Sequence, residues 1–402
     1  AGVYTKQVRE MNEVAKKSNK IFGIMFNQRT NCLYRKAHEI VHSGKYGELK
    51  RVTWIITDWY RTQAYYNSGG WRATWSGEGG GVLLNQCPHQ LDLWQWICGM
   101  PEKITAVCHE GKWHDIEVED DVMIYAQYKN GATGTFITTT GDFPGTNRLE
   151  ITLDKAKIIC ENSVLTVTEL SQSVSENIYA SEDGFTSIES KTYEAELDGR
   201  NEQHTEVMNK FAAAILRGEE LTASGEEGIN GLTISNAMHL SSWLGKEIEI
   251  ATFDHDKFYE LLQERMAPDL NSVAQAIARK NQWHIQISGS AALNFLGLST
   301  QIPMSTIFYS DGPNRTFLIE DRKLQFKHKI LKESKIASPM SEIVVQALSE
   351  LGDNHISEET IKIIRAKITD DERKKLWNET QYVRSWIRSA IERICQAEII
   401  QP

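Results

Sequence analysis

A histidine and two polar neighbours follow a glycine-rich stretch at a spacing that could support acid–base chemistry. In residues 77–94, GEGGGVLLNQCPHQLDLW, the side chains Asn85, His89 and Asp92 recur at intervals of four and three residues. An aspartate one turn after a histidine can fix the tautomer of the ring and raise its basicity, which leaves the other nitrogen to exchange a proton near neutral pH. Such a pair would serve the oxidation of an alcohol to a ketone by hydride transfer. The alternative, which the pattern alone favours, is a structural pair on the surface of a helix.

The glycines before these residues also have two interpretations. A dinucleotide-binding loop has the spacing GxGxxG between a strand and a helix, because the glycines let the backbone approach the pyrophosphate. Gly77, Gly79, Gly80 and Gly81 lack that spacing and follow the loop-like sequence WRATWS. We therefore interpret them as allowing close approach of the backbone at the start of a helix.

Aromatic and arginine side chains crowd the segment just before the glycines. The sequence DWYRTQAYYNSGGWRATW suits stacking on a sugar ring, with arginine and aspartate binding hydroxyls or carboxylates. Tyr60 and Arg72 are the candidates for substrate contacts. A loop held together by aromatic packing explains the composition equally well.

Residues 108–121 are rich in histidine and acidic side chains without a regular ligand spacing. We interpret them as a solvated turn between strands and expect no metal site there. The six cysteines are scattered along the chain with no CxxC pair, so neither a disulfide framework nor a zinc site is indicated.

Composition and charge indicate a globular protein with more than one domain. Of 402 residues, 41% are hydrophobic and 24% are charged. No stretch reaches the roughly 18 apolar residues of a membrane span, and no signal sequence is evident, so we expect a cytoplasmic protein without a membrane partner. Residues 267–402 contain 18 Lys and Arg and 16 Asp and Glu. The first 266 residues therefore contain 26 Lys and Arg and 38 Asp and Glu, which is a net charge of −12. This charge makes a nucleic-acid partner unlikely for the first region.

Hydrophobic periodicity predicts an α+β fold. Helical patterns cover residues 3–18, 32–42, 82–98, 202–216 and 226–244, and a short helix capped by Asp254 closes the region. IFGIMFN is a run of buried-strand type, and later strands with a hairpin turn at Asn130 and Gly131 imply a large antiparallel sheet. The pattern restarts at Pro268 and Asp269, which break one helix and cap the next. Short strands and then three or four helices follow, as in a smaller α+β domain.

Four stretches together resemble the Gfo/Idh/MocA family of NAD(P)-dependent oxidoreductases. They are FGIMFNQR, GKYGELKRV, GEGGGVLLNQCPHQLDLWQWICGMP and VEDDVMIYAQYKNGATGTF, and they stand in the family's order and at its spacing. The resemblance covers residues 1–266. It implies the C-terminal remnant of a Rossmann α/β nucleotide-binding domain at residues 1–48. A substrate and oligomerisation domain with a large, open, mostly antiparallel sheet then occupies residues 49–266.

The resemblance also implies roles for individual residues. The first helix of the family's second domain carries an Asp or Asn and, four residues later, a His, which correspond here to Asn85 and His89. His89 then acts as the acid–base or substrate-orienting residue, with Asn85 beside it and Asp92 in support. Asn27 and Arg29 correspond to a region that borders the nicotinamide in relatives.

The family's glycine-rich cofactor loop and its Glu-Lys-Pro lysine have no counterpart in this sequence. The resemblance implies NAD or NADP as cofactor, but much of the affinity for it comes from the backbone donors of that loop. We therefore expect poor cofactor binding by this chain alone. We also expect an unpaired strand edge where the family's first strands belong.

Residues 268–402 resemble a different family, the C-terminal domain of AbiEi-like antitoxins from type IV toxin–antitoxin systems. The stretch NSVAQAIARKNQWHIQISGSAALNFLGLSTQIPMSTIFYSDGPNR carries this likeness. It implies a toxin-like protein partner for residues 267–402. Because both regions lack the N-terminal parts of their families, the chain resembles two joined gene segments.

Two functional hypotheses follow from these features. The first is hydride transfer between NAD(P) and a sugar or polyol hydroxyl in a homo-oligomer that associates through the large sheet, with His89 relaying the proton and Asn85 orienting the substrate. The second is a non-catalytic binding or regulatory protein of toxin–antitoxin type, since the cofactor loop and the lysine are absent.

Overall fold

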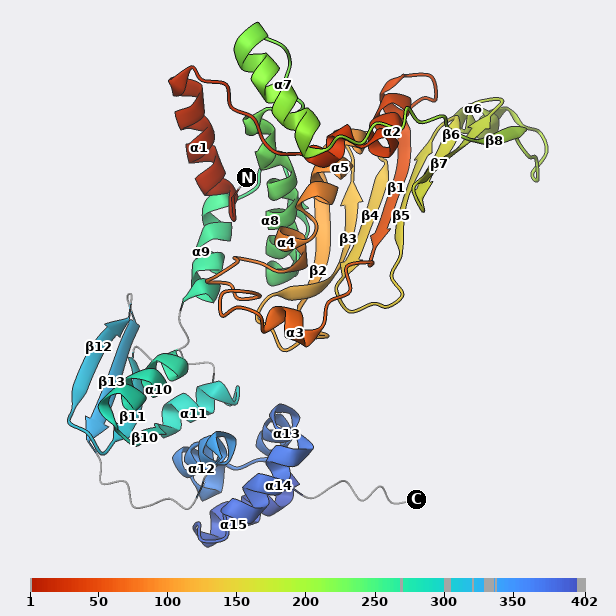
Figure 1. Ribbon diagram of the computed structural model, residues 1–402. Helices are drawn as coiled ribbons and strands as arrows, with labels where there is room; N and C mark the ends of the chain where they lie inside the picture. Colours follow the sequence, from red (N-terminus) through yellow and green to blue (C-terminus); the bar gives the residue numbers. More distant parts are fainter. Residues whose placement is uncertain are drawn as a thin grey trace. The chain divides into compact units, whose positions relative to one another are not determined.

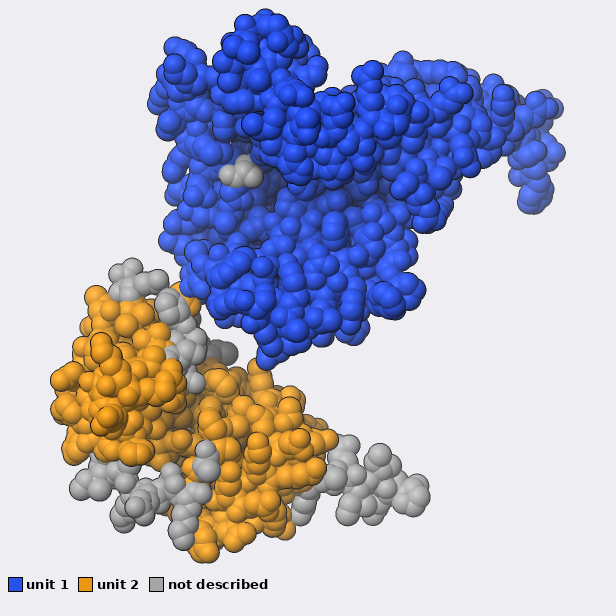
Figure 2. Space-filling model, in the orientation of Figure 1, with its two compact units in different colours: residues 1–266 blue, residues 267–402 orange. Residues whose placement is uncertain are grey.

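The computed structural model describes residues 2–267, 270–299, 305–319, 322–328, 336 and 338–395. The chain divides into two units, Ala1–Met266 and Ala267–Pro402, each with its own hydrophobic core (Figure 2). Pro268 and Asp269, predicted to separate two helices, lie outside the described residues. None of the described helices is long and apolar enough to cross a membrane.

A nine-stranded sheet forms the centre of the first unit (Figure 1). Its strands lie in the order β8 (Ser190–Glu194), β7 (Val164–Leu170), β6 (Ala156–Glu161), β5 (Asn147–Leu153), β1 (Leu49–Ile56), β4 (Thr133–Thr139), β3 (Glu119–Gln127), β2 (Lys103–Glu110) and β9 (Ile248–Glu249). Strands β1 and β4 pair in parallel, and the other described neighbours are antiparallel. Gly131, at a φ of 83°, forms the turn between β3 and β4. The predicted large, mostly antiparallel sheet is confirmed.

Helices cover one face of this sheet. The helices α2 (Cys32–His42), α5 (Pro88–Cys98) and α8 (Gly228–Leu244) pack against it, and Trp94 of α5 stacks on Phe136 of β4 with ring centroids 5.4 Å apart (Figure 1). Residues of β3 alternate accordingly: Ile124 is buried, whereas Met123 and Tyr125 are 55% and 45% exposed. The opposite face of the sheet is therefore open at β3.

The remaining helices of the first unit are peripheral. They are α1 (Thr5–Ser18), η1 (Asn27–Thr30), α3 (Gln63–Tyr66), α4 (Val82–Asn85), α6 (Val174–Ala180), α7 (His204–Arg217), η2 (Gly225–Glu227) and α9 (His255–Met266). Asp254 accepts a hydrogen bond from the backbone N–H of Lys257 at 2.8 Å, which confirms the predicted cap of α9.

The predicted single helix that ends near Cys98 is two helices. The first, α4, ends at Asn85, and α5 begins at Pro88. Proline has no N–H to continue a helix and disfavours helical geometry in the residue before it, so the chain stops and restarts at this point. As a result, Asn85 and His89 lie on different helices, not on one continuous face.

The run IFGIMFN is not a buried strand, and the N–H of Phe26 bonds to the carbonyl of Ile24 at 2.9 Å, which turns the chain at Met25. Its sole bridge within the described ranges joins Gly23 to Ser224 in antiparallel orientation. The side chains of Ile21 and Met25 are 45% and 37% exposed. A run of this composition is buried only when strands pair with both of its edges, and here one edge is paired.

The second unit is a smaller α+β domain that ends in helices, as predicted. Its sheet has the order β10 (Ile285–Ile287), β11 (Ser305–Ser310), β13 (Arg322–His328) and β12 (Arg315–Ile319). Its helices are α10 (Leu270–Asn281), α11 (Gly289–Phe295), α12 (Pro339–Leu351), η3 (Asp353–His355), α13 (Glu358–Lys367), α14 (Asp370–Glu379) and α15 (Ser385–Cys395). The strand β12 was not predicted from the sequence.

Candidate functional site

The glycine-rich stretch brings the backbone against a buried carboxylate. Glu119, the first residue of β3, accepts hydrogen bonds from the backbone N–H of Gly81 at 2.8 Å and of Leu83 at 3.0 Å. A Cβ on Gly81 would lie 1.9 Å from the carbonyl oxygen of Glu119, so glycine is required there. This confirms that the glycines permit close approach at the start of a helix.

Glu119 and Asp120 are fully buried, which corrects the interpretation of this segment as a solvated turn. Glu119 lies 3.1 Å from Nε2 of His239 on α8. Burial alone would raise the pKa of Glu119, but His239 and backbone donors lower it below its ordinary value. Asp120 is hydrogen-bonded to Nδ1 of His114 at 2.9 Å. Glu119 therefore stabilises the start of α4, and Asp120 stabilises the turn that contains His114.

Asn85 and Arg72 meet at a shared carboxylate. Nδ2 of Asn85 donates to Glu78 at 2.5 Å, and Nη1 of Arg72 lies 3.7 Å from the same oxygen. Arg72 also donates to the hydroxyl of Tyr65 at 2.8 Å and lies over its ring, 4.4 Å from the centroid. The structure thus brings two predicted substrate-site residues together through Glu78, which the sequence did not single out.

Tyr60 is not part of this network. Its ring is 46% exposed and packs against Phe143, with centroids 5.6 Å apart, and its carbonyl accepts a hydrogen bond from Arg61 at 2.9 Å. Within the described residues it has no recorded contact with Arg72 or Asn85. The structure therefore does not bring Tyr60 and Arg72 together.

His89 lies in the first turn of α5 and is half-buried. Its Nδ1 atom is buried without a hydrogen-bond partner in the described chain, and its ring faces Phe26 edge-on, with centroids 6.3 Å apart. Burial lowers the pKa of His89 below its ordinary value, a shift that Asp92 opposes and His204 reinforces. The ring is therefore neutral at neutral pH and is able to accept a proton.

The spacing predicted that Asp92 would bind the ring of His89. In the structure Asp92 binds Arg29 instead. Nε and Nη2 of Arg29 donate to the two carboxylate oxygens at 2.9 and 2.7 Å, and Gln95 donates to one of them at 3.0 Å. Both ionic side chains are only 2% exposed. A bidentate arginine is a stronger partner for a buried carboxylate than a neutral ring, so Asp92 is committed to it.

Arg29 is consequently an internal residue. It also donates to Glu227 at 2.7 Å, and its guanidinium lies over the rings of Phe26 and Trp96 at 5.2 and 5.4 Å. Burial would lower the pKa of Arg29, but the hydrogen bonds to Asp92 and Glu227 raise it. The guanidinium therefore stays charged and links η1, α5 and η2.

Asn27, the other residue predicted beside the nicotinamide, is 4% exposed. Its Nδ2 donates to the side chain of Gln203 at 2.7 Å, and its Oδ1 is buried without a partner in the described ranges. Gln203 precedes α7 with a φ of 46°, in the region that non-glycine residues rarely adopt. This strained residue fixes one end of the Asn27 amide.

A small cavity of about 180 Å³ adjoins Pro88 and Phe26, which are the chain neighbour and the ring neighbour of His89. It is lined by Gly2, Val3, Phe26, Leu83, Leu84, Pro88, Leu91, Gly228, Gly231, Leu232 and Ser235. The hydroxyl of Ser235 is buried without a hydrogen-bond partner among the described residues. Sequence reasoning missed Ser235, although it shares one face of α8 with Gly228 and Gly231 at helical spacing, a pattern that leaves room beside a helix.

The size of this cavity limits the kind of group that it could hold. Ligand pockets commonly measure about 300–1,000 Å³, so 180 Å³ suits a single ring more than a dinucleotide. Among the residues that line it, Ser235 has a buried hydroxyl without a partner in the described chain, which could bind a polar group of that ring. The described residues include no glycine-rich helix start that would bind the phosphates, so the site accounts for the ring end alone.

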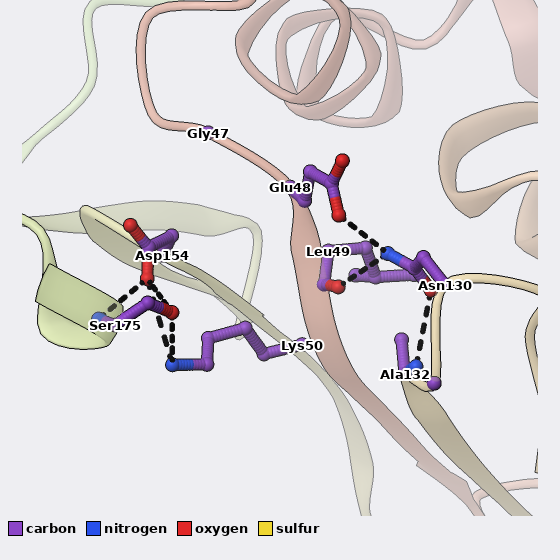
Figure 3. Close-up of a pocket in the computed structure, with 9 residues that line it drawn as sticks. Gly47, Glu48, Leu49, Lys50, Asn130, Ala132, Asp154 and Ser175 are labelled. Atoms are coloured by element: carbon purple, nitrogen blue, oxygen red, sulfur yellow. Dashed lines mark hydrogen bonds and ion pairs between the residues drawn. The ribbon is translucent and has the colours of Figure 1, made fainter. Parts of the chain in front are cut away.

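A second cavity, of about 450 Å³, lies where β1 begins (Figure 3). Ser175 donates to Oδ1 of Asp154 from its backbone N–H at 2.9 Å and from its hydroxyl at 2.6 Å. Nζ of Lys50 lies 3.5 Å from the same oxygen. Asn130 donates to the carbonyl of Leu49 at 2.9 Å. These groups satisfy one another and tie turns to the sheet. The described residues also contain no cluster of three or more His, Cys, Asp or Glu side chains that could hold a metal ion.

The chain matches two family models. Residues 34–159 match the GFO/IDH/MocA C-terminal domain, and residues 253–376 match DUF6088, a family of unknown function. The first match contains Asn85, His89 and Asp92. The second assigns no activity to the second unit, so the antitoxin-like character of that unit is not confirmed. No curated protein matches the chain.

Two of the solved structures to which the chain is similar are dehydrogenases. Levoglucosan dehydrogenase in complex with NADH and L-sorbose is 18% identical, with a TM-score of 0.52 over 62% of this chain and 71% of that chain. The WlbA dehydrogenase from Chromobacterium violaceum, in complex with NADH and UDP-GlcNAcA, is 23% identical, with a TM-score of 0.49 over 62% and 68% of the two chains. The likeness to the first establishes a shared fold.

Proposed function

We propose that residues 1–266 form the substrate-binding part of an NAD(P)-dependent dehydrogenase that acts on a sugar or polyol hydroxyl. The observation that carries the proposal is His89, a half-buried, neutral imidazole whose Nδ1 has no partner in the described chain and whose neighbours Phe26 and Pro88 line a cavity. The match of residues 34–159 to the GFO/IDH/MocA C-terminal domain and the fold shared with levoglucosan dehydrogenase support it.

In this proposal His89 takes the proton of the substrate hydroxyl as the alcohol becomes a ketone. A neutral imidazole is the form that accepts a proton, and burial maintains that form at neutral pH. Asn85 and Arg72, both bound to Glu78, orient the remaining hydroxyls. Asp92 acts indirectly, because its bonds to Arg29 fix the helix that carries His89.

A nicotinamide, when bound, would accept the hydride. Ser235, whose buried hydroxyl lines the cavity without a partner in the described chain, would hold its ring end, and Asn27 is proposed there by resemblance alone. The phosphates would need donors that the described residues do not supply. NAD and NADP are not distinguished by these contacts.

Calorimetric titration of the full chain with NADH and with NADPH tests the proposal first. Binding in the micromolar range would support it, and oxidation of a panel of sugars and polyols would follow. His89→Gln should then lower kcat/KM by roughly 10² to 10⁴ without changing NADH affinity, whereas the matched control Tyr60→Phe should leave both nearly unchanged. No binding at millimolar cofactor would refute the proposal and leave the non-catalytic alternative.

Two partners complete the proposal by resemblance. The open face of the large sheet, where Val107, Met123 and Tyr125 are about half exposed, is the surface proposed for homo-oligomerisation. A toxin-like protein is the partner proposed for residues 267–402. Titration of the full chain with the product of a neighbouring toxin gene tests the second partner.

A further inference from the structure

The imidazole ring of His114 lies between two acceptor atoms. Its Nδ1 atom is 2.9 Å from Oδ2 of Asp120, and its Nε2 atom is 3.0 Å from the backbone carbonyl oxygen of Arg61. A carbonyl oxygen can only accept, so the hydrogen of that second bond belongs to Nε2. The side chains of His114 and Asp120 are 7% and 0% exposed, so both ring nitrogens depend on these two protein atoms.

The contact with Asp120 requires a second hydrogen. A neutral imidazole carries one N–H, and its other nitrogen is an acceptor that would repel a carboxylate oxygen at 2.9 Å. The carboxylate of Asp120 also accepts from three backbone N–H groups, at 3.0, 2.9 and 3.0 Å, which are those of Lys112, Trp113 and His114. Imidazole is a stronger base than a carboxylate with this many donors, so the hydrogen between Asp120 and Nδ1 belongs to the ring.

The carbonyl that His114 binds belongs to the aromatic segment, residues 58–75. The N–H of Arg61 donates to the carbonyl of Thr140 at 2.9 Å, and the hydroxyl of Tyr66 lies 2.8 Å from Oγ1 of Thr140. The ring of Tyr66 also packs on the ring of His114, with centroids 4.8 Å apart. His114 and Thr140 together therefore hold the first part of the aromatic segment.

Arg61 links this contact to the proposed substrate residues. Its guanidinium lies over the ring of Tyr65, 5.0 Å from the centroid, and the hydroxyl of Tyr65 accepts from Arg72 at 2.8 Å. Arg72 in turn lies 3.7 Å from the carboxylate oxygen of Glu78 that Asn85 binds. A displacement of Arg61 would therefore change the position of Arg72.

We infer that the ring of His114 carries both protons and that this charged ring clamps the aromatic segment at Arg61. The inference rests on the proposed function where it assigns substrate binding to Arg72, whereas the clamp itself does not depend on that function. A ring that loses one proton has one N–H left for two acceptors. A charged acceptor forms the stronger bond, so Asp120 keeps that N–H and the bond to Arg61 is lost. The clamp should therefore open as the pH rises.

The other titratable groups around the ring do not replace it. Burial raises the pKa of Tyr66 to about 12, so its hydroxyl stays neutral. The guanidinium of Arg61 donates to two backbone carbonyls of its own segment, at 3.3 and 2.9 Å, and the ammonium of Lys112 lies 2.8 Å from Asp121. His114 is therefore the group whose loss of a proton would release Arg61.

Neutral contacts hold the aromatic segment further along. Gln63 exchanges hydrogen bonds with the backbone of Asp115 at 2.9 and 3.1 Å, and the N–H of Glu117 donates to the carbonyl of Ala73 at 3.2 Å. These bonds involve no group that titrates. The release should therefore be local to Arg61.

The ring nitrogens of His114 can be observed directly, in the full chain and without cofactor or substrate. In nitrogen-15 spectra of histidine-labelled protein at pH 7, both nitrogens of His114 should give the signals of a protonated ring. His109 is the matched control, because its Nδ1 lies 2.9 Å from Asp121 but its side chain is 48% exposed and no described residue bonds to its other nitrogen. As the pH is raised, His109 should become neutral before His114 does. The variants His114→Gln and His109→Gln assign the two sets of signals.

Hydrogen exchange then tests whether this charge holds the segment. Protection of the Arg61 amide, corrected for the intrinsic rate at each pH, should fall roughly tenfold as His114 loses its proton. The amide of Thr140, which donates to the carbonyl of Asp120 at 3.0 Å, should stay protected and so separates local release from unfolding. His114→Gln should show the lower protection of Arg61 already at pH 7, whereas His109→Gln should not.

A second variant tests the chemistry of the clamp. Asp120→Asn places an N–H donor opposite Nδ1, so a neutral ring can keep its bond to Arg61, and the fall in protection with pH should disappear. A neutral ring of His114 in the parent chain at pH 7, or protection of Arg61 that does not follow the charge of the ring, would overturn the inference. Neither measurement needs dehydrogenase activity, so a failure to bind NADH would refute the proposed function and leave the clamp intact.

Discussion

Two sets of buried polar groups in the first unit differ in whether they have hydrogen-bond partners. Around Arg29 and Asp92, the buried charges are matched by bidentate and additional hydrogen bonds. Elsewhere in the first unit, Nδ1 of His89, Oδ1 of Asn27 and the hydroxyl of Ser235 are buried without partners in the described chain, and Ser235 lines a cavity. A buried polar group without a partner costs about 1–3 kcal/mol, so such atoms mark positions where a ligand could supply the missing partner.

The largest effect on stability should come from breaking the buried ion pair of Arg29 and Asp92. Arg29→Met should lower the free energy of unfolding of the first unit by about 3–5 kcal/mol, because it leaves Asp92 buried without its bidentate partner. Urea denaturation followed by tryptophan fluorescence measures this change. The double variant Arg29→Met, Asp92→Leu should recover much of the loss, since the buried charge of Asp92 is then gone and Glu227, whose side chain is 39% exposed, is solvated. A double variant as unstable as Arg29→Met would show that packing of the guanidinium against Phe26 and Trp96, not charge pairing, dominates.

A smaller effect is expected at Glu119, which anchors the glycine-rich stretch. Glu119→Gln should lower stability at neutral pH by about 1–3 kcal/mol, because it weakens the bonds to Gly81, Leu83 and His239. The pKa of Glu119 is lower in the folded chain than its ordinary value of 4.5, so its stabilisation is complete above that pH and is lost as the pH falls through the folded value. Stability measured from pH 7 to pH 3 should therefore show the two proteins converging in acid. A constant difference would contradict the role of the ionised carboxylate.

The sheet and most helices were predictable because their signals are local. The helix at α2 matches its predicted range, and Asp254 caps α9 as its position before an apolar helical run indicated. Pro88 also indicated the break between α4 and α5. The sequence analysis nevertheless predicted one helix, because the apolar residues keep a helical spacing on both sides of the proline. The exposure of residues 21–26 was not readable from IFGIMFN itself, because burial of a strand depends on what pairs with its two edges.

The site was harder to predict because its contacts join distant parts of the chain. The spacing of His89 and Asp92 indicated a pair, but the partner of Asp92 lies 63 residues earlier, at Arg29. Helical spacing establishes which side chains share a face and not which of two donors a carboxylate binds. The partnership of Asn85 with Arg72 through Glu78 likewise depends on a loop whose path has no periodic signal.

The smallest effect on stability should come from Ser235, whose buried hydroxyl has no partner in the described chain. Comparing it with a bonded serine tests directly whether unpartnered groups contribute to stability. Ser235→Ala removes a hydroxyl that has no partner in the described chain, so it should change the free energy of unfolding by less than about 0.5 kcal/mol, in the direction of greater stability if it changes at all. Urea denaturation beside the parent chain measures this, with Ser241→Ala as the matched control on the same helix. Ser241 donates to the carbonyl of Lys246 at 2.7 Å and accepts from the N–H of Ala106, so its loss should cost about 1–2 kcal/mol. Equal losses at the two serines would mean that Ser235 is bonded in solution, and the cavity would then lose its free hydroxyl.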